Sequence, residues 1–532
     1  MKKTLITMVA CLCCVLTAQA QTYWNGTADK NLPGDGTEAS PYLISTPEQL
    51  AGLAARVNDD GEDFAGKVVQ LANDLWISEL AEGKDTLDWE PIGHQVWKWG
   101  EETKYAYFRG TFDGAGHTIH NLYYGKGADF GVGFDPLDLD VELGEMDFSS
   151  YNKGLFCNVE DGTIKNLNLK NAMMSGVGNV ALIAAFLSEG SVVSNCHVQG
   201  KMHGTQVSLG GIVSKNEGLI ENCSADIETD GAGMGGIVYE NQTTGIVRDC
   251  SATGSARCTA GNGGGVVNYN YGLVERSSAS VDIQALYGTN GAVNASGNKV
   301  YSPHFAGGFV VYNWTGGIIR ECYATGNLSA NGNGRLGGFA LYNYGRIESS
   351  YSTGRMTDIT DYNTLAGSVT MAQFVVYNGQ LAHHDDDSAY PGDCINCFTT
   401  SVCELRKDDN QSEEFYINNC AAFLYEYNHG QAGFRDYSRD YSHEIGVYWN
   451  KDGIPQFSGN LNSPLGRECT VSYMQSQAFV DELNKMARFM GSSQWEYRTG
   501  QLPRATGVCT KDASDFFTGG VGTKENPYLI NN

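Results

Sequence analysis

Proline, basic residues and long apolar runs are scarce in this 532-residue chain, and each shortage excludes a class of protein. Beyond the first twenty residues no apolar run reaches the roughly 20 residues that a membrane-spanning helix needs, so we expect no membrane insertion. Lysine and arginine total 35 against 61 aspartate and glutamate residues. Such an acidic surface repels nucleic acid and anionic lipid, and we expect neither as a partner. Only 11 prolines accompany 67 glycines, which favours many short strands joined by tight turns.

Familiar catalytic motifs are also missing from the sequence. It contains no Gly-x-Ser-x-Gly nucleophile elbow and no phosphate-binding loop. His443 and Glu444 are adjacent, but no second histidine follows at the spacing that binds zinc on a helix. Carboxylates are too numerous for one acidic pair to stand out. We therefore expect a chain that is not an enzyme and that needs no cofactor.

The first twenty residues have the pattern of a signal peptide. Lys2 and Lys3 precede an apolar run from Leu5 to Leu16, and Ala18-Gln19-Ala20 supplies small residues for the peptidase. We expect cleavage after Ala20 and a secreted or cell-surface protein, on the outer surface or in the periplasm. Removal of this leader leaves 33 basic and 61 acidic residues, a net charge of −28.

A repeating unit of about 27 residues dominates the chain from Gly154 to Phe398. A period of this size indicates a solenoid, because one unit cannot bury its apolar face without its neighbours. Each strong copy starts with two glycines and an apolar residue, and an asparagine follows four residues after the apolar position. These asparagines are Asn216, Asn241, Asn270, Asn313 and Asn343.

Apolar residues at three fixed offsets mark a second strand in each copy. Around Cys223, Ile220 lies three residues before and Ala225 two residues after. Strict alternation cannot place these offsets on one face, so we expect a corner between the first and the second. At the position two residues before the cysteine, acidic and basic residues alternate between copies, which suits directly stacked coils. This column contains Glu221, Arg248, Glu275, Arg320 and Glu348.

The sequence therefore predicts an all-β fold, a right-handed parallel β-helix or solenoid with two short strands in each coil. The open ends need covers, because unpaired strand edges aggregate. Thr46 to Gln49 combines an N-cap, a proline at the first helical position and a capping-box glutamine, which predicts a short helix near the start. Apolar residues at helical spacing from Ser476 to Arg488 predict another near the far end.

These features divide the chain into five parts. We expect a signal peptide at 1–20, an N-terminal capping module at 21–124, solenoid repeats with insertions at 125–430, a C-terminal capping region with a helix at 431–510 and a linker at 511–532. Within the last part, residues 522–530 echo residues 36–44, so it either starts a second module or closes the structure. Insertions at 125–151, 286–306 and 380–392 are candidate recognition loops.

Two columns are expected to serve the structure, and the cysteine column is expected to face inward. The asparagines tolerate left-handed corners and can form hydrogen-bonded ladders between coils. In the cysteine column we expect buried thiols, because stacked Cβ atoms ~4.8 Å apart exceed the usual disulfide separation. The members of that column are Cys196, Cys223, Cys250 and Cys322.

Other cysteines and histidines are weaker candidates for chemistry. Cys394 and Cys397 have redox or zinc spacing, but both fall on core offsets, which favours packing. His383, His384 and Asp385 could hold a metal, although adjacent side chains point apart and a solvated loop is favoured. Four cysteines outside the regular array are the expected disulfide partners, namely Cys403, Cys420, Cys469 and Cys509.

The segment from Gly307 to Gly326 contains Gly-Gly-Phe-Val-Val-Tyr-Asn, then Ile319, then Cys-Tyr-Ala-Thr-Gly. This segment and the one from Gly210 to Ala225 resemble the GLUG repeat of secreted and surface bacterial proteins. The resemblance implies a β-solenoid with an adhesin-like role at the cell surface. Some proteins with this repeat carry an IgA-type metallopeptidase domain, whose signature this chain lacks.

A double aromatic stripe is the strongest candidate for a binding site. Stacked coils would align its members along one edge, where aromatic faces suit glycan rings or seal a corner of the solenoid. Three residues after the apolar positions come Tyr269, Tyr312, Tyr342 and Tyr377, and two residues further on come Tyr271, Trp314 and Tyr344.

From these features we expect a non-catalytic adhesin or scaffold that binds a host or bacterial surface glycan or protein. One alternative is a polysaccharide lyase or glycoside hydrolase, because parallel β-helices host such chemistry where acid and base groups converge in a lateral groove. Another alternative is a structural spacer of a larger surface protein, with no ligand.

Overall fold

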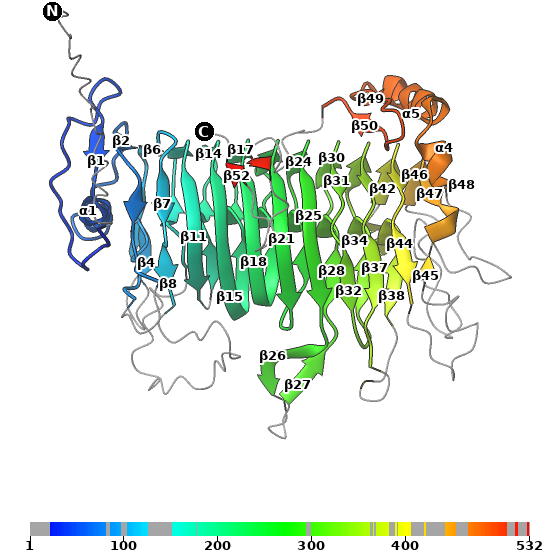
Figure 1. The fold of residues 1–532 in the computed structure, drawn as a ribbon, viewed down its shortest axis with the longest axis horizontal. Coiled ribbons are helices and arrows are strands. Elements are labelled where there is room, and N and C mark those ends of the chain that lie inside the picture. Colours follow the sequence, from blue (N-terminus) through cyan, green and yellow to red (C-terminus); the bar gives the residue numbers. More distant parts are fainter. Residues whose placement is uncertain are drawn as a thin grey trace, which may run out of the picture.

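The computed structural model describes residues 22–80, 86–96, 104–125, 152–176, 178–293, 299–361, 365, 369–381, 389–390, 392–405, 420–421, 442–453, 466–507, 517–519 and 529–530. They form a parallel β-helix, which confirms the all-β solenoid expected from the repeats (Figure 1). Three sheets run along the stack, and successive coils add parallel strands to them. We number these sheets 1, 2 and 3. The predicted leader lies outside the described residues.

Sheet 1 pairs short strands from the first coil to the last. Its described strands, in order, are β1 (Tyr42–Ile44), β2 (Val68–Leu71), β6 (Thr111–Asp113), β10 (Thr163–Lys165), β14 (Val192–Ser194), β17 (Leu219–Glu221), β20 (Ile246–Arg248), β24 (Leu273–Glu275), β30 (Ile318–Arg320), β35 (Arg346–Glu348), β42 (Gly392–Ile395) and β46 (Ser442–Ile445).

Sheet 2 carries the candidate site described below. Its strands are β9 (Phe156–Val159), β13 (Ala184–Leu187), β16 (Val213–Asn216), β19 (Val238–Asn241), β23 (Val267–Asn270), β29 (Val310–Asn313), β34 (Ala340–Asn343) and β39 (Val375–Asn378).

Sheet 3 forms the third wall, with long strands in the middle coils and shorter segments elsewhere. Its strands are β3 (Leu75–Trp76), β7 (Thr118–His120), β8 (Tyr123–Tyr124), β11 (Asn168–Ser175), β12 (Asn179–Ala181), β15 (His197–Gly210), β18 (Ser224–Gly235), β21 (Ser251–Cys258), β22 (Gly263–Gly264), β25 (Ser278–Ala285), β28 (Phe305–Gly307), β31 (Tyr323–Ala324), β32 (Leu328–Ala330), β33 (Arg335–Gly337), β36 (Tyr351–Ser352), β37 (Arg355–Asp358), β38 (Thr370–Ala372), β43 (Phe398–Thr399), β44 (Val402–Glu404), β45 (Cys420–Ala421), β47 (Tyr448–Asn450) and β48 (Arg467–Cys469).

Short antiparallel hairpins and a few helices lie outside the three sheets. The antiparallel hairpins are β4 (His94–Val96) with β5 (Lys104–Ala106), β26 (Gly288–Val293) with β27 (Lys299–Ser302), β40 (Gln380–Leu381) with β41 (Ala389–Tyr390), β49 (Trp495–Glu496) with β50 (Arg504–Ala505), and β51 (Phe517–Gly519) with β52 (Leu529–Ile530). The helices are α1 (Pro47–Asn58), α4 (Val471–Met474), α5 (Gln477–Met490) and the 3-10 turn η2 (Lys451–Gly453). None of these helices combines the length and apolarity that a membrane crossing needs.

One coil runs from β16 through β17 to β18 and then enters β19. The prediction of two strands per coil is wrong, because the third side is also a strand. β18 pairs in parallel with β15 on one side and β21 on the other. Its inward positions include Thr229 and Gly231, which are buried but carry little apolar signal, so the sequence pattern did not reveal the strand.

A left-handed corner joins sheet 1 to sheet 3 at the place where the apolar spacing predicts one. The residue just before the cysteine position has a positive φ, for example 52° at Asn222 and 54° at Asp249. Asparagine and aspartate tolerate this conformation because their short side chains can bond locally. The same corner recurs at Asn195, Arg276, Glu321, Ser349 and Asn396.

The second glycine of each Gly-Gly pair is required because neighbouring coils approach closely there. A Cβ added to Gly236 would lie 1.9 Å from the carbonyl oxygen of Gly265, and one added to Gly265 would lie 2.0 Å from that of Gly308. Any larger side chain would have to push the next coil away, so this glycine sets the repeat.

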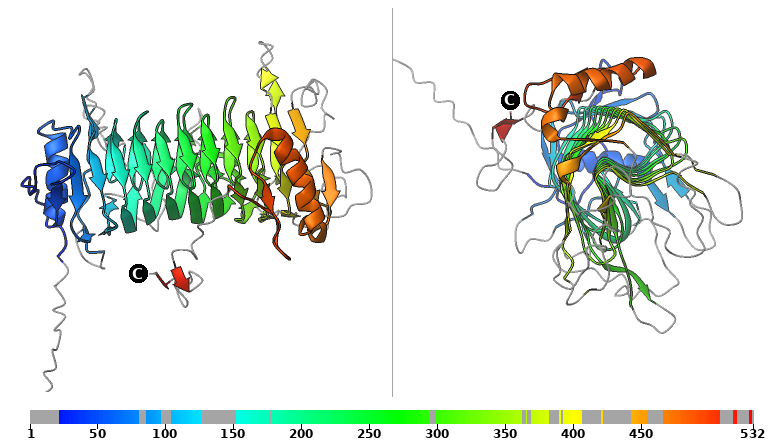
Figure 2. Two further views of the ribbon diagram at one scale, coloured as in Figure 1. Left: turned by 90° about the horizontal axis from the view of Figure 1, so that it is seen from above. Right: turned by 90° about the vertical axis from the view of Figure 1, so that its right-hand side faces the viewer.

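The two predicted helices lie near opposite ends of the stack (Figure 1). At the start of α1, Thr46 Oγ1 accepts a hydrogen bond from the Gln49 N–H, and Gln49 Oε1 accepts one from the Ser45 N–H at 2.8 Å. Helix α5 begins after its N-cap Ser476 and ends at the left-handed Gly491. It lies along the flank of the last coils, against the outer side of sheet 3 (Figure 2).

Candidate functional site

The outer side of sheet 2 carries a continuous column of tyrosines. Strand register pairs Tyr269 with Tyr312, Tyr312 with Tyr342, and Tyr342 with Tyr377. Their ring centroids are 5.0, 4.7 and 4.9 Å apart, and no two neighbouring planes differ by more than 11°. All four side chains are partly buried. We call these four residues the tyrosine column.

A second aromatic row runs beside the tyrosine column. The Trp314 ring lies 6.0 Å from Tyr271, 5.3 Å from Tyr344 and 5.7 Å from Tyr312. Burial raises the pKa of Tyr271 and of Tyr344 above its usual value. The buried Trp314 Nε1–H has no hydrogen-bond partner in the part of the chain that the structure describes. All seven predicted aromatic residues therefore lie together.

The stacking decides what this surface offers a ligand. Each inner tyrosine has its ring faces against its neighbours, which stabilises the stack by ~0.5–1.5 kcal/mol per pair. Ring edges and hydroxyls are left for a partner. Arg335 Nη1 donates a hydrogen bond to the Tyr342 hydroxyl at 2.9 Å, and its guanidinium lies 5.5 Å from the Tyr377 centroid. Contact with the column would therefore be made through edges and hydroxyl groups.

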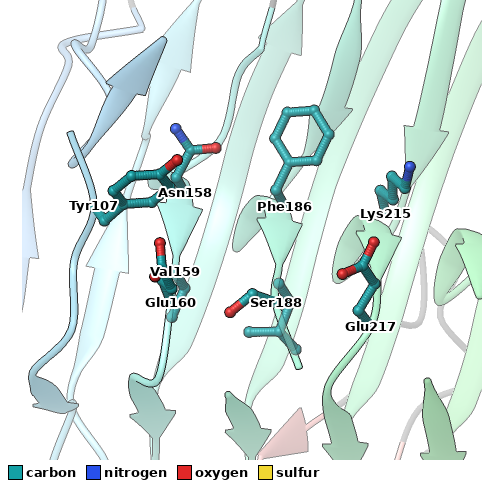
Figure 3. A pocket seen from close by; sticks show the side chains of 9 residues that line it. Tyr107, Asn158, Val159, Glu160, Phe186, Ser188, Lys215 and Glu217 are labelled. Carbon is teal, nitrogen blue, oxygen red and sulfur yellow. The ribbon is translucent and has the colours of Figure 1, made fainter. Parts of the chain in front are cut away.

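In the earlier coils, the sheet 2 position that the tyrosines occupy is held by other residue types. From Tyr269 the column passes through Glu240, Lys215 and Phe186 to Asn158. The last three lie at a hollow of about 150 Å³ that Tyr107, Glu160, Ser188 and Glu217 also line (Figure 3). The sequence analysis missed this hollow, although Phe186, like the tyrosines, lies three residues after an apolar position.

The hollow has charges of both signs. Arg109 Nη2 binds Glu160 Oε1 at 2.7 Å, and the Arg109 guanidinium lies 5.6 Å from the Tyr107 ring centroid. Burial and the nearby Glu160 carboxylate raise the pKa of Tyr107. The Thr244 hydroxyl donates to the backbone carbonyl of Glu217 at 2.8 Å, whereas the Lys215 ammonium and the Glu217 carboxylate form no ion pair or hydrogen bond with any described residue. They are therefore available to polar groups of a ligand.

The asparagines form a buried ladder at the ends of the sheet 2 strands, next to the aromatic columns. Each Nδ2 donates to the Oδ1 of the asparagine in the next coil. The distances are 2.8 Å for Asn216 to Asn241, 2.9 Å for Asn241 to Asn270, 2.8 Å for Asn270 to Asn313, 2.8 Å for Asn313 to Asn343 and 2.6 Å for Asn343 to Asn378. None of these residues has a positive φ, so the left-handed corners expected there lie at other positions.

The cysteine column is buried, and its members are thiols. Each Sγ lies close to the backbone carbonyl two residues earlier, at 3.3 Å for Cys196, 3.2 Å for Cys223, 3.1 Å for Cys250 and 3.2 Å for Cys322. Burial raises the pKa of Cys196 and Cys322. Ser277 donates the same hydrogen bond at 2.9 Å, which explains why serine can replace cysteine in this column.

The remaining predicted sites have mixed outcomes. Cys394 and Cys397 are both buried in the core, on opposite sides of the left-handed Asn396. Cys469 is a buried thiol in the apolar cluster beneath α5, so its predicted disulfide is wrong. The structure places Cys403 as buried on β44 and Cys420 on β45.

The candidate metal ligands His383, His384 and Asp385 lie outside the described residues, as does Cys509. Among the residues that are described, no three His, Cys, Asp or Glu side chains gather closely enough to hold a metal ion.

A second aromatic column lies on sheet 3, and α5 covers it. The Tyr351 ring stacks on Tyr323 at 5.2 Å and on Phe398 at 4.9 Å. Phe479 of α5 meets Phe398 edge-on at 5.5 Å, with the planes 84° apart. Trp495 packs beside them, 5.4 Å from Phe398. We call Tyr323, Tyr351, Phe398 and the in-register Tyr448 the covered column.

Neither a protein-family model nor a curated protein matches this chain, so the GLUG resemblance stays a prediction. A solved structure of a candidate immunoglobulin A1 protease from Bacteroides ovatus is 16% identical, over 89% of this chain and 94% of that one, with a TM-score of 0.31. A structure named IgA1 protease is 15% identical, over 74% of this chain and 26% of that one, with a TM-score of 0.34.

These names contradict one expectation from the sequence. We expected a chain that is not an enzyme, yet both similar structures are named as proteases. The expectation relied on missing short motifs, and such motifs do not transfer between unrelated catalytic sites. We withdraw it. Likeness at this level of identity transfers no individual residue, so we assign no catalytic group.

Proposed function

We propose that this chain is an exported surface scaffold that binds an extended, neutral glycan along the outer side of sheet 2. The observation that carries the proposal is the tyrosine column of the double aromatic stripe, which repeats with the coil spacing and stays partly exposed, whereas α5 covers the column on sheet 3. The proposal concerns what this face binds and is independent of any catalytic centre.

The geometry of the stripe suits a polymer lying across the strands. Tyrosine combines an apolar body with a hydroxyl that can donate and accept, and the tyrosine column presents one such group about every 5 Å. From β9 to β39 the face spans seven strand spacings, or about 34 Å. A repeating ligand could therefore make the same contact in successive coils.

The charge of the chain narrows the class of glycan. The net charge is −26, and Glu160, Glu217 and Glu240 lie on or beside the face. Polymers rich in uronate or sialic acid would be repelled by a surface of this sign. A neutral glycan avoids that repulsion and still offers hydroxyls for hydrogen bonds.

The test compares two aromatic substitutions on a neutral glycan array and a mucin array. Trp314→Ala removes the centre of the second row, and we expect at least about a tenfold loss of affinity because it removes several aromatic contacts. Phe489→Ala is the matched control, since Phe489 is 87% exposed on α5. Binding that is absent from both arrays, or that survives Trp314→Ala unchanged, would overturn the proposal.

A protein partner is the second candidate, and the covered column favours it. There, the amphipathic helix α5 packs Phe479 nearly perpendicular to the stacked rings, so an amphipathic helix of a partner could dock on the tyrosine column in the same way. Retention of a protein-coated mucin after enzymatic removal of its glycans would point to this candidate.

A further inference from the structure

Phe186 occupies the same register position on sheet 2 as the tyrosines, but its neighbours in the column are not aromatic. In register it stands between Asn158 and Lys215, and Figure 3 shows the ring between those two side chains. No described aromatic ring stacks on it, whereas Tyr312 has a ring on either side at 5.0 and 4.7 Å. The faces of the Phe186 ring are therefore not taken up by other aromatic rings, as those of the inner tyrosines are.

Polar groups surround this ring on several sides. The Lys215 ammonium and the Glu217 carboxylate, from β16 and the turn after it, have no hydrogen bond or ion pair with the described residues. On the other side Glu160 is held by Arg109 at 2.7 Å, and the Asn158 amide donates to the His94 carbonyl at 3.2 Å. An aromatic face ringed by donors and acceptors matches a sugar ring, whose C–H groups pack on the π face while its hydroxyls bond outward.

We propose that the hollow is a saccharide subsite in which Phe186 packs against the C–H face of one neutral pyranose ring while Lys215 and Glu217 bind its hydroxyls. This inference rests on the proposed function and deepens it, because it identifies the residues that bind one sugar of the glycan. Two carboxylates, Glu160 and Glu217, and one ammonium, Lys215, line the hollow, so the subsite selects an uncharged sugar over a uronate.

The subsite and the tyrosine column can act on one chain of sugars. From Phe186 to Tyr269 the column crosses three strand spacings, or about 14 Å. A glycan that lies across the strands would pass from the hollow over Lys215 and Glu240 to the first tyrosine. The hollow fixes one residue of the glycan, and the tyrosines extend the contact.

The experiment measures binding of defined hexasaccharides to the full chain by titration calorimetry. The neutral probes are cellohexaose, mannohexaose and N-acetylchitohexaose, and the anionic probe is hexagalacturonate. We expect Phe186→Ala to weaken binding of a neutral probe about threefold to tenfold, and Phe186→Tyr to retain it. Lys215→Ala, which removes a side chain without a described partner, should weaken it with no change in melting temperature. Phe489→Ala is the control.

The outcomes separate this inference from the proposed function. Loss in Trp314→Ala with wild-type binding in Phe186→Ala overturns the subsite and leaves the proposed function standing. Loss in Phe186→Ala alone supports the subsite and overturns the role of the aromatic stripe. Tighter binding of hexagalacturonate than of every neutral probe overturns the subsite, and absence of binding to all four probes overturns both.

Discussion

The protein has two columns of stacked aromatic rings, and they differ in how far they are buried. On sheet 3 the chain covers its stacked rings with α5, so that Tyr351 is 7% and Phe398 0% exposed. On sheet 2 the tyrosine column has the same stacking distance but remains only partly buried. Stacking between coils is thus a property of the repeat, whereas burial of the column needs a separate element.

The covered column also shows how ring edges are recognised in this protein. Phe479 stands nearly perpendicular to Phe398 and to Tyr448, with the planes 84° and 86° apart. Edge-to-face contact is favourable because the ring edge is positive and the face negative. The tyrosine column presents equivalent edges with added hydroxyls, which is why we assign it to a partner that can also form hydrogen bonds.

The largest effect is expected in the covered column. Phe398→Ala removes a fully buried ring that contacts Tyr351, Phe479 and Trp495. We expect a loss of about 3–5 kcal/mol in the free energy of unfolding of the C-terminal coils, measured by urea denaturation followed through amide hydrogen exchange of the peptide that contains Trp495. A loss below about 1 kcal/mol would show that α5 is not held by this column.

The second-largest loss of stability is expected in the asparagine ladder. This ladder lies beside the tyrosine column and ends before the last coils. Asn270→Ala leaves Asn241 Nδ2 and Asn313 Oδ1 each without a ladder partner, at a cost of about 2–4 kcal/mol in unfolding free energy. Asn216→Ala, at the end of the ladder, should lose about half as much.

In a solenoid each coil contacts mainly its neighbours, so urea denaturation of Asn270→Ala should leave the Trp495 transition unchanged. If the Trp495 transition lost as much unfolding free energy as the middle coils do, the asparagine ladder and the covered column would not stabilise the protein independently.

A smaller loss in the free energy of unfolding is expected when one ring of the tyrosine column is removed. Tyr312→Ala removes three stacked ring pairs from a side chain that is already partly exposed, and we expect a loss of about 1–2 kcal/mol in the free energy of unfolding. Comparison with Phe398→Ala in the same denaturation experiment measures what the cover adds. Equal losses for the two substitutions would remove the distinction between the columns.

The smallest effect concerns pH. Burial raises the pKa of Tyr448 to about 12 from about 10 in an unfolded chain. The folded state therefore keeps this proton longer than the unfolded state does, so its contribution to stability is complete below pH 10 and is lost as the pH rises toward 12. Tyr448→Phe should reduce the slope of stability against pH in that window, measured by urea denaturation followed through amide hydrogen exchange of the peptide that contains Trp495. An unchanged slope would show that Tyr448 does not titrate there.

Sequence reasoning recovered the features that repeat and missed those that occur once. The corner before Cys223, the Gly-Gly pairs and the aromatic stripe each recur at a fixed offset, so several copies support each inference. The hollow was missed because Phe186 occupies the stripe position in a coil whose neighbours carry Asn158 and Lys215. The third strand of each coil was missed because its inward residues include glycine and threonine, whose apolar signal is weak.

The sequence by itself determined the parallel β-helix, since the Gly-Gly spacing and the left-handed corner constrain the backbone locally in every copy. Only the tertiary structure decided which column is covered and where the hollow forms. Those outcomes depend on contacts between distant segments, as when Phe479 reaches Phe398 and Tyr107 reaches the coil of Phe186. No local pattern encodes such contacts, because they exist only once the coils have stacked.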